Sequence, residues 1–277
     1  MRHVSGTREV QRPVVFSLLA AAILSACASE VAPTPDRLEL LFSGRQEVVD
    51  LTHSVSAEAP FWPVSQDTPF SYDVLASHPD GTPIMGVYHV PEHFGTHLDA
   101  PIHGGEGLLP SDRIPVERFF ARAVIIDVTA QASADPDYAA TADDALRWEE
   151  ANGRIPDGAV VIVRSGWASR WSEGDAYYNR DESGVLHFPG FAVSLARFLI
   201  DERNINGIGL DSGSVDPGNA SGFPVHAIVN GAGKYHLENL ADLSSLPEVG
   251  AGLIVAPIKI EGGSGGQVRV FAVLPPG

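Results

Sequence analysis

The chain has 277 residues and an acidic composition, because 35 Asp and Glu residues stand against 18 Lys and Arg and give a formal net charge of −17. Phosphate binding needs a basic surface, so this charge argues against nucleic acid as a partner. The length is sufficient for one sizeable hydrophobic core. No internal repeat or long linker divides residues 46–277, which we predict to form a single domain.

Residues 1–26 have the features of a lipoprotein signal peptide. Three arginines precede an apolar stretch at 14–24, which is shorter than the roughly 20 residues of a membrane-spanning helix. The sequence Leu-Ser-Ala-Cys that follows resembles a bacterial lipobox, and Cys27 is the only cysteine. We therefore expect an exported, periplasmic or cell-surface lipoprotein anchored to the membrane through lipidated Cys27, with 27–45 as a tether. The alternative is a plain cleavable signal peptide with an incidental cysteine.

Short runs of β-branched and aromatic residues between turn formers predict a sheet-rich domain. The expected strands cover 47–55, 70–75, 85–90, 123–128, 159–164, 207–210, 252–260 and 267–274. Three helices are expected at 145–150, 191–202 and 225–232. Strands that outnumber interspersed helices indicate an α/β, sheet-rich single domain.

The segment 93–103 carries the clearest chemical signal, because His93, His97, Asp99 and His103 all fall at positions of the same parity. In an extended chain these four side chains would project to one side and the intervening apolar residues to the other. Gly95 and Pro101 argue against a helix here. We interpret the segment as an extended metal-binding run.

Imidazole nitrogens with one carboxylate suit a first-row divalent ion such as zinc or manganese and leave positions open for water and substrate. The competing interpretations are ordinary polar strand residues or a closed structural metal site. His226 and His236 flank the third expected helix, and Glu238 follows them. From spacing alone, a functional role and a hydrogen-bonded core role are equally supported for these two histidines.

The sequence of 93–103 matches His-x-Gly-Thr-His-x-Asp-x-Pro-x-His, and so the chain resembles the metal-dependent cyclase-family hydrolases, which include bacterial kynurenine formamidase and isatin hydrolase. The resemblance extends to Pro-Phe-Trp-Pro at 60–63, Gly-Leu-Asp at 209–211, Phe-Pro-Val-His at 223–226 and Glu-Asn-Leu at 238–240. It covers most of the chain after about residue 46.

The resemblance implies a swivelling β/β/α fold, a homo-oligomer and one or two divalent ions per subunit. The metal ligands that it implies are His93, His97, Asp99, His226 and Glu238. In the formamidase pattern Asp99 would bridge two ions and His226 would hold the second, with Glu238 shared between them. Isatin hydrolase is similar in the first motif but is described with one manganese. The presence of both His226 and Glu238 favours two ions here.

The implied chemistry is amide hydrolysis, in which a metal-bound hydroxide attacks a small amide and His103 acts as the acid/base that passes a proton to the leaving nitrogen. The expected substrate is a cyclic amide such as an isatin-like ring, or an N-formyl-aryl amide. Trp62 and Phe94 are the candidate substrate-binding residues. Because formylkynurenine is processed in the cytoplasm, export predicts that it is not the physiological substrate.

Two alternatives remain open at this point. One is a lactone or carbamate hydrolase, or a cyclase, of the same family. The other is a non-catalytic metal-binding or solute-binding lipoprotein. His103 argues against a pure binder, because such a protein needs no additional base beside its ligands.

Overall fold

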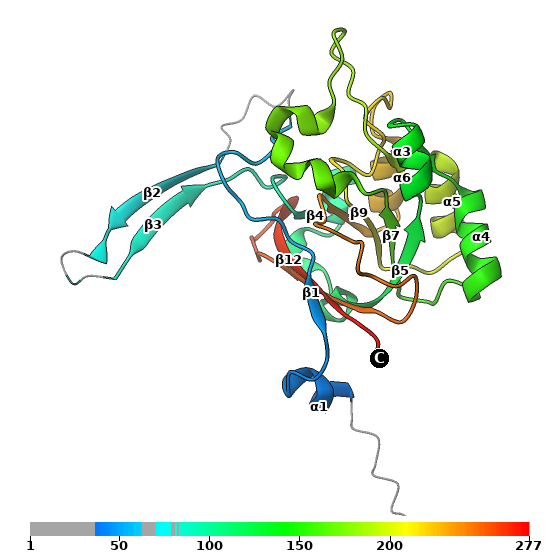
Figure 1. Ribbon diagram of the computed structural model, residues 1–277, viewed down its shortest axis with the longest axis horizontal. Helices are drawn as coiled ribbons and strands as arrows, with labels where there is room; N and C mark the ends of the chain where they lie inside the picture. The colour runs from blue at the N-terminus through cyan, green and yellow to red at the C-terminus, as the bar shows by residue number, and fades with distance from the viewer. Residues whose placement is uncertain (1–36, 63–69, 79–80, 82, 277) are drawn as a thin grey trace, which may run out of the picture. The chain divides into compact units, whose positions relative to one another are not determined.

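The strands lie in one eight-stranded sheet and two small two-stranded pairs (Figure 1). The computed structural model describes residues 37–62, 70–78, 81 and 83–276, so the predicted signal peptide lies outside the described residues. The eight-stranded sheet comprises β1 Val48–Asp50, β4 His97–Asp99, β5 Phe120–Asp127, β7 Val160–Arg164, β9 Gly207–Leu210, β10 Tyr235–Glu238, β11 Gly252–Pro257 and β12 Gly265–Val273. The pairs are β2 Ser71–Ala76 with β3 Met85–His89 and β6 Ala139–Ala140 with β8 Gly190–Phe191.

The large sheet closes on itself. Strands β5, β7, β9 and β10 run parallel to one another, whereas β11 pairs antiparallel with β5 and with β12, and β12 pairs antiparallel with β1. The short strand β4 pairs with β10 on one side and with β12 on the other, which joins the two ends of the sheet. The predicted α/β, sheet-rich fold is therefore confirmed, and the sheet forms a barrel.

Four α-helices between residues 129 and 231 lie on the side of the barrel that the parallel strands form (Figure 1). The α-helices are α1 Arg37–Phe42, α2 Pro101–Gly104, α3 Thr129–Ala134, α4 Ala142–Asn152, α5 Val193–Asp201 and α6 Pro224–Gly231. The 3-10 helices are η2 Ser111–Arg113, η3 Val116–Phe119 and η4 Trp167–Tyr178. Since α1 lies within 27–45, part of the segment that we predicted to be a tether is helical. No helix among the described residues has the length and apolar character that spanning a bilayer requires.

The central parallel strands bury both faces, as their continuous apolar sequence predicts. Val124 and Ile126 of β5 pack in the cluster beneath α4, α5 and α6, whereas Ile125 between them packs inside the barrel. The same alternation holds for β7, with Val161 beneath the helices and Ile162 in the barrel. This double coverage fixes the register of the strands, because a shift of one residue would exchange the two clusters.

Candidate metal centre

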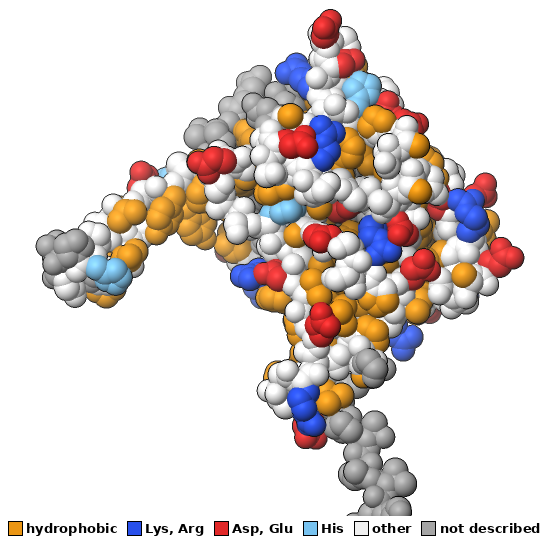
Figure 2. Space-filling view, viewed as in Figure 1, with side chains coloured by type: hydrophobic (Ala, Val, Ile, Leu, Met, Phe, Trp, Pro, Cys, Tyr) orange, Lys and Arg blue, Asp and Glu red, His pale blue; other side chains and the backbone are white. Residues whose placement is uncertain are grey.

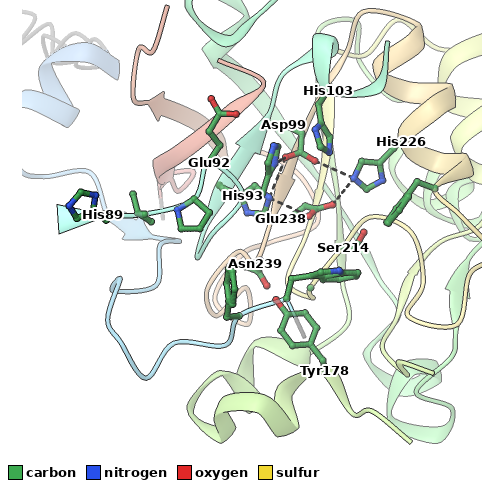
Figure 3. Close-up of a pocket in the computed structure, with 17 residues that line it drawn as sticks. His89, Glu92, His93, Asp99, His103, Tyr178, Ser214, His226, Glu238 and Asn239 are labelled. Carbon is green, nitrogen blue, oxygen red and sulfur yellow. Dashed lines mark hydrogen bonds and ion pairs between the residues drawn. The ribbon is translucent and has the colours of Figure 1, made fainter. Parts of the chain in front are cut away.

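The 93–103 segment is extended over only three residues, which corrects the expectation of one continuous strand. His93 lies in a bend at residues 92–96, in which Gly95 has a left-handed φ of 65°, and His103 lies on α2. Pro101 does not prevent a helix here, because it occupies the first turn, where its missing N–H has no intrahelical partner to lose. Despite this geometry, His93, Asp99, His103, His226 and Glu238 meet at one side of a cavity (Figure 3).

The pairing of β4 with β10 places four possible metal ligands in a two-by-two arrangement. His97 lies opposite Glu238, and Asp99 lies opposite His236. Residues two apart on a strand face the same side, so all four side chains share one face of the pair. The sequence separation of these residues is large, and only the closure of the barrel brings them together.

Asp99 is almost completely buried at the centre of this arrangement, and its two carboxylate oxygens have different neighbours. Oδ1 lies 2.6 Å from His93 Nδ1 and 3.2 Å from His97 Nε2. Oδ2 lies 3.2 Å from His226 Nε2 and 3.6 Å from His236 Nδ1. Asp99 thus faces two groups of donors, which is the arrangement that a bridging carboxylate requires.

Glu238 lies between the same histidines. Its Oε2 is 3.4 Å from His97 Nε2, and its Oε1 is 3.4 Å from His226 Nε2. The backbone N–H of Val215 also donates to Oε1 at 2.8 Å and fixes the carboxylate. Two buried carboxylates therefore share one small volume, which is costly unless positive charge lies between them.

Histidines provide this positive charge when they are protonated. Burial lowers the pKa of His97, but Asp99 and Glu238 raise it to about 10. For His226, burial likewise lowers the pKa, and the contacts with Asp216, Asp99 and Glu238 raise it to about 10. Burial raises the pKa of Asp99, while the surrounding histidines lower it well below its ordinary value.

The cluster fits a divalent cation. His97 Nδ1 donates to the carbonyl of Gly95 at 3.0 Å, and His226 Nδ1 donates to Asp216 at 2.7 Å. In both rings this leaves Nε2, the nitrogen that faces the carboxylates, available as a ligand. His97 Nε2 and Asp99 Oδ2 are buried and without a hydrogen-bond partner among the described residues. His93 differs, since its two nitrogens contact Asp99 and Ser264.

Asp216, which the sequence analysis did not identify, holds His226 in place. Its carboxylate accepts the N–H groups of Val225 and His226 at 2.8 and 3.2 Å and also the imidazole of His226. It therefore caps the first turn of α6 and selects the ring nitrogen that faces the cluster. Asp216 is ten residues before His226 in a loop, and no local pattern marks it.

His103 lies at the accessible edge of the cluster. Its ring is 4.1 Å from that of His93 and 5.6 Å from that of His226, measured between centroids. Partial burial lowers the pKa of His103, although the charge of Asp99 opposes the change. A neutral, accessible imidazole beside the buried donors suits an acid/base. His93, Asp99 and His103 could also hold an ion among themselves.

The cavity above the cluster has a volume of about 790 Å³ and aromatic walls. Trp62 lies edge-on to Tyr178, with 5.4 Å between the ring centroids, and both line the cavity. Phe61 and Phe223 line it as well. Phe94 is not among the described residues that line this cavity, because it is buried behind Phe61. Of the two predicted substrate-binding residues, Trp62 therefore lines the cavity, whereas Phe94 contacts Phe61 and is buried.

Asn239 and Tyr178 are further cavity residues that the sequence analysis missed. Asn239 has a positive φ of 52°, and its side-chain amide donates to the carbonyl of Gly95 at 3.1 Å. This bond ties the end of β10 to the bend before β4 and so supports His97. Asn239 stands within the Glu-Asn-Leu sequence at 238–240 that the family resemblance includes, but its positive φ and its bond to Gly95 cannot be read from the sequence.

A barrel with buried histidines and carboxylates beneath an aromatic cavity is the arrangement expected of a metal-dependent hydrolase. The family model described as putative cyclase matches residues 49–217, and the chain belongs to this cyclase family. It is 34% identical over 250 residues to the isatin hydrolase of Roseibium aggregatum, a match that covers 85% of this chain and 94% of that protein. It is 27% identical over 227 residues to the kynurenine formamidase of Salinibacter ruber, with 80% and 95% covered.

The structure is similar to that of isatin hydrolase A from Ralstonia solanacearum, with a TM-score of 0.80, 34% identity and coverage of 88% of this chain and 99% of that chain. These relatives confirm the predicted family and fold. They also confirm the predicted enzyme class, since they are hydrolases that act on carbon–nitrogen bonds of amides other than peptides.

Proposed function

We propose that this protein hydrolyses a small cyclic amide, such as an isatin-like ring, to a carboxylate and an amine. The observation that carries the proposal is the buried cluster of Asp99, Glu238 and histidines at the base of an aromatic cavity. The cavity volume is within the range of small-molecule sites. Flat aromatic walls favour an aryl substrate. The 34% identity to two isatin hydrolases favours a ring amide over an N-formyl-aryl amide.

We assign separate roles to the residues around the cavity. Trp62 and Tyr178 would hold the aryl ring of the substrate. Asp99 and Glu238, with His93, His97 and His226, would hold one or two divalent cations such as zinc or manganese. A bound cation of this kind would lower the pKa of a water from about 15.7 toward 7. His103, which is accessible and beside the donors, would take the proton of that water and pass it to the leaving nitrogen.

The direct test is turnover of a panel of substrates by the purified, cation-loaded protein. Isatin and other cyclic amides, N-formyl-aryl amides including formylkynurenine, lactones and carbamates would be compared by following the ring-opened or deformylated products. We expect kcat/KM to be highest for a cyclic aryl amide. A clear preference for formylkynurenine or for lactones would refute this choice of substrate, and no turnover of any acyl compound would favour a binding protein.

We also propose export and membrane anchoring through Cys27, on the basis of the sequence of residues 1–27. The test is expression with a labelled fatty acid, followed by fractionation and mass spectrometry. Cys27→Ala should abolish the label and move the protein from the membrane fraction to the soluble exported fraction. Label-free wild-type protein in the cytosol would contradict the proposal.

Finally, we propose that the protein is a homo-oligomer, with a second copy packed on the β2–β3 ribbon. Tyr72, Val74, Met85, Val87 and Tyr88 are exposed on this ribbon, which extends from the barrel as a largely apolar arm (Figures 1 and 2). These five half-exposed side chains, at roughly 100 Å² each, supply about 500 Å², which is more than half of the about 800 Å² per partner of a standard interface.

Charge supports a second copy over a charged partner. The two strands carry a single charged side chain, Asp73, in a chain of net charge −17. An uncharged surface lets two copies of the same net charge meet without placing like charges against each other at the contact. Sedimentation analysis should show a dimer or larger oligomer that Val74→Glu with Val87→Glu converts to a monomer; an unchanged sedimentation coefficient would contradict the proposal.

A further inference from the structure

His236 is a buried titratable residue that the proposed ligand set does not use. It is fully buried on β10, and neither of its ring nitrogens has a hydrogen-bond partner among the described residues. Leaving a buried polar group unpaired costs about 1–3 kcal/mol. A histidine at such a position needs a partner that the described side chains do not provide.

The nearest charged atom does not satisfy His236 by a hydrogen bond. Asp99 Oδ2 lies 3.6 Å from His236 Nδ1, which exceeds the 2.7–3.2 Å typical of N–H···O bonds. The distance does match two ligands of one ion, because metal–ligand bonds of about 2.1 Å in a tetrahedral site separate neighbouring ligand atoms by about 3.4 Å. The contact between Asp99 and His236 is therefore better explained by a shared ion than by direct bonding.

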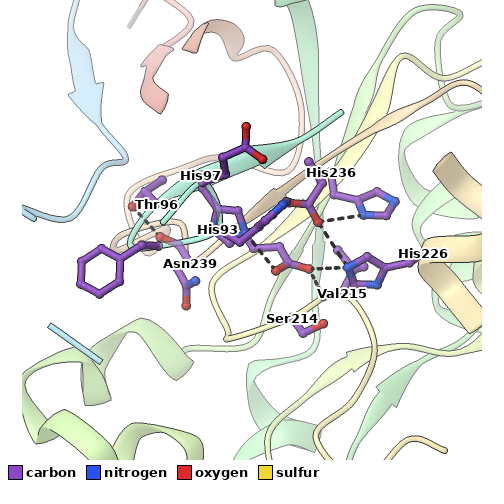
Figure 4. A network of polar contacts seen from close by, with 12 residues as sticks. His93, Thr96, His97, Ser214, Val215, His226, His236 and Asn239 are labelled. Atoms are coloured by element: carbon purple, nitrogen blue, oxygen red, sulfur yellow. Dashed lines mark hydrogen bonds and ion pairs between the residues drawn. The ribbon is translucent and has the colours of Figure 1, made fainter. Parts of the chain in front are cut away.

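Three other donors face the same point. His236 lies beside His226, with 4.8 Å between the ring centroids and an interplanar angle of 87° (Figure 4). One ligand atom each from Asp99, His226, His236 and Glu238 lies within 4.8 Å of the other three. His226 Nε2 is 3.2 Å from Asp99 Oδ2 and 3.4 Å from Glu238 Oε1. Two imidazoles and two carboxylates suit a zinc-like divalent ion.

We propose that His236 is a direct ligand of a divalent cation that Asp99, His226 and Glu238 also bind. The inference rests on the proposed cation-dependent function and extends its ligand set by one residue. It divides the cluster at Asp99, whose Oδ1 faces His93 and His97 and whose Oδ2 faces His226 and His236.

The test compares cation binding by His236→Asn, His236→Leu and the wild type. Asparagine places an N–H near the position of histidine Nδ1, so it keeps a donor that faces Asp99, but its amide is a poor ligand for zinc or cobalt. Cobalt(II) titration, followed by visible absorption, and zinc competition with a chromophoric chelator would give the number and affinity of bound ions. Loss of a residue that merely orients a ligand costs about 10–100-fold in metal affinity. We therefore expect loss of a direct ligand to lower the binding affinity of one ion by at least about 100-fold.

His53→Asn is the matched control. His53 also has a buried ring nitrogen without a hydrogen-bond partner among the described residues, but it stacks on Trp171 and lines a second cavity. Its replacement should leave the ion number, affinities and cobalt spectrum unchanged. Circular dichroism and melting of the cation-free proteins would show that each variant is folded; if His236→Leu is not, the milder His236→Asn decides.

The outcomes separate this inference from the proposed function. Weaker binding of one ion in both His236 variants, with the His53 control unchanged, supports a ligand role. Normal binding in both variants overturns it, and so does normal binding in His236→Asn alone, because His236 would then only position Asp99. A wild type that binds no divalent cation would instead refute the proposed cation-dependent function.

Discussion

Asp216→Asn tests how the fold prepares His226 for cation binding. Asp216 receives the Nδ1–H of His226 at 2.7 Å, and His226 Nε2 then faces Asp99 and Glu238. Asparagine can retain the bond from the N–H of Val225 through its oxygen, but its NH2 group then faces His226. Two donors cannot bond to each other, so the imidazole must move its proton to Nε2 or rotate. Either change removes the nitrogen that the cluster offers to an ion.

The expected magnitude follows from these bonds. Loss of a partner that orients a metal-binding histidine costs about 10–100-fold in metal affinity, which corresponds to roughly 1.4–2.7 kcal/mol. Asp216 also accepts the N–H of His226 at 3.2 Å, and leaving a buried donor unpaired costs about 1–3 kcal/mol. We therefore expect weaker cation binding together with a lower free energy of unfolding for the cation-free protein.

Isothermal titration with zinc and urea unfolding of the cation-free protein would measure both effects. Asp242→Asn is the matched control, because exposed Asp242 accepts the backbone N–H and hydroxyl of Ser244 in a surface turn. It should change neither quantity by more than a few tenths of a kcal/mol. Cation affinity in Asp216→Asn equal to that of the wild type would refute the argument that Asp216 sets the ring orientation and tautomer of His226.

Three further predictions follow from the site. His103→Ala should lower kcat by about 100–10,000-fold with unchanged cation content; equal loss of cation and activity would identify His103 as a ligand. Trp62→Ala should raise KM about threefold to tenfold, because an aromatic contact contributes about 0.5–1.5 kcal/mol, and steady-state kinetics showing only a lower kcat would contradict a ring-holding role. His97 and His226 have pKa values raised to about 10 and bind an ion only when neutral, so cation affinity should rise with pH from about 6.5 toward 10. Calorimetric titration in buffers of different protonation enthalpy should detect protons released on cation binding. If no protons are released, the raised pKa values are contradicted.

The sequence predicted the sheet well where strands are apolar and regular. The expected strand 207–210 matches β9 at both ends, and 123–128 lies almost entirely within β5. The strand β10 was missed, because its four residues include His236 and Glu238, which are unusual in a buried strand. Their burial depends on the neighbouring β4, and pairing between distant segments leaves no local periodicity.

The candidate site was predictable to the extent that its residues share a short segment. His93, His97, Asp99 and His103 were identified by their parity, although the structure reaches the same cavity through a bend at Gly95 and a helix instead of one strand. The four residues selected by parity line one cavity, because His97 and Asp99 share a face of β4 and the turn of α2 returns His103 to it. His226 and Glu238 required the family resemblance, since spacing supported a core role equally well.

The positions of His103 and His93 depend on close packing against neighbouring elements. This packing requires glycines whose role cannot be recognised from the sequence. A Cβ on Gly104 would stand 2.4 Å from Cβ of Asn230, so α2 can approach α6 only without a side chain there. A Cβ on Gly265 would stand 2.7 Å from Cε1 of His93, so β12 can lie against that ring only because residue 265 has no side chain. Both positions are ordinary in the sequence, and their role appears only when the barrel closes and brings α2, α6 and β12 around the donors. The donors can therefore be predicted as a set, but the distances between them come from contacts made by residues that carry no chemistry themselves.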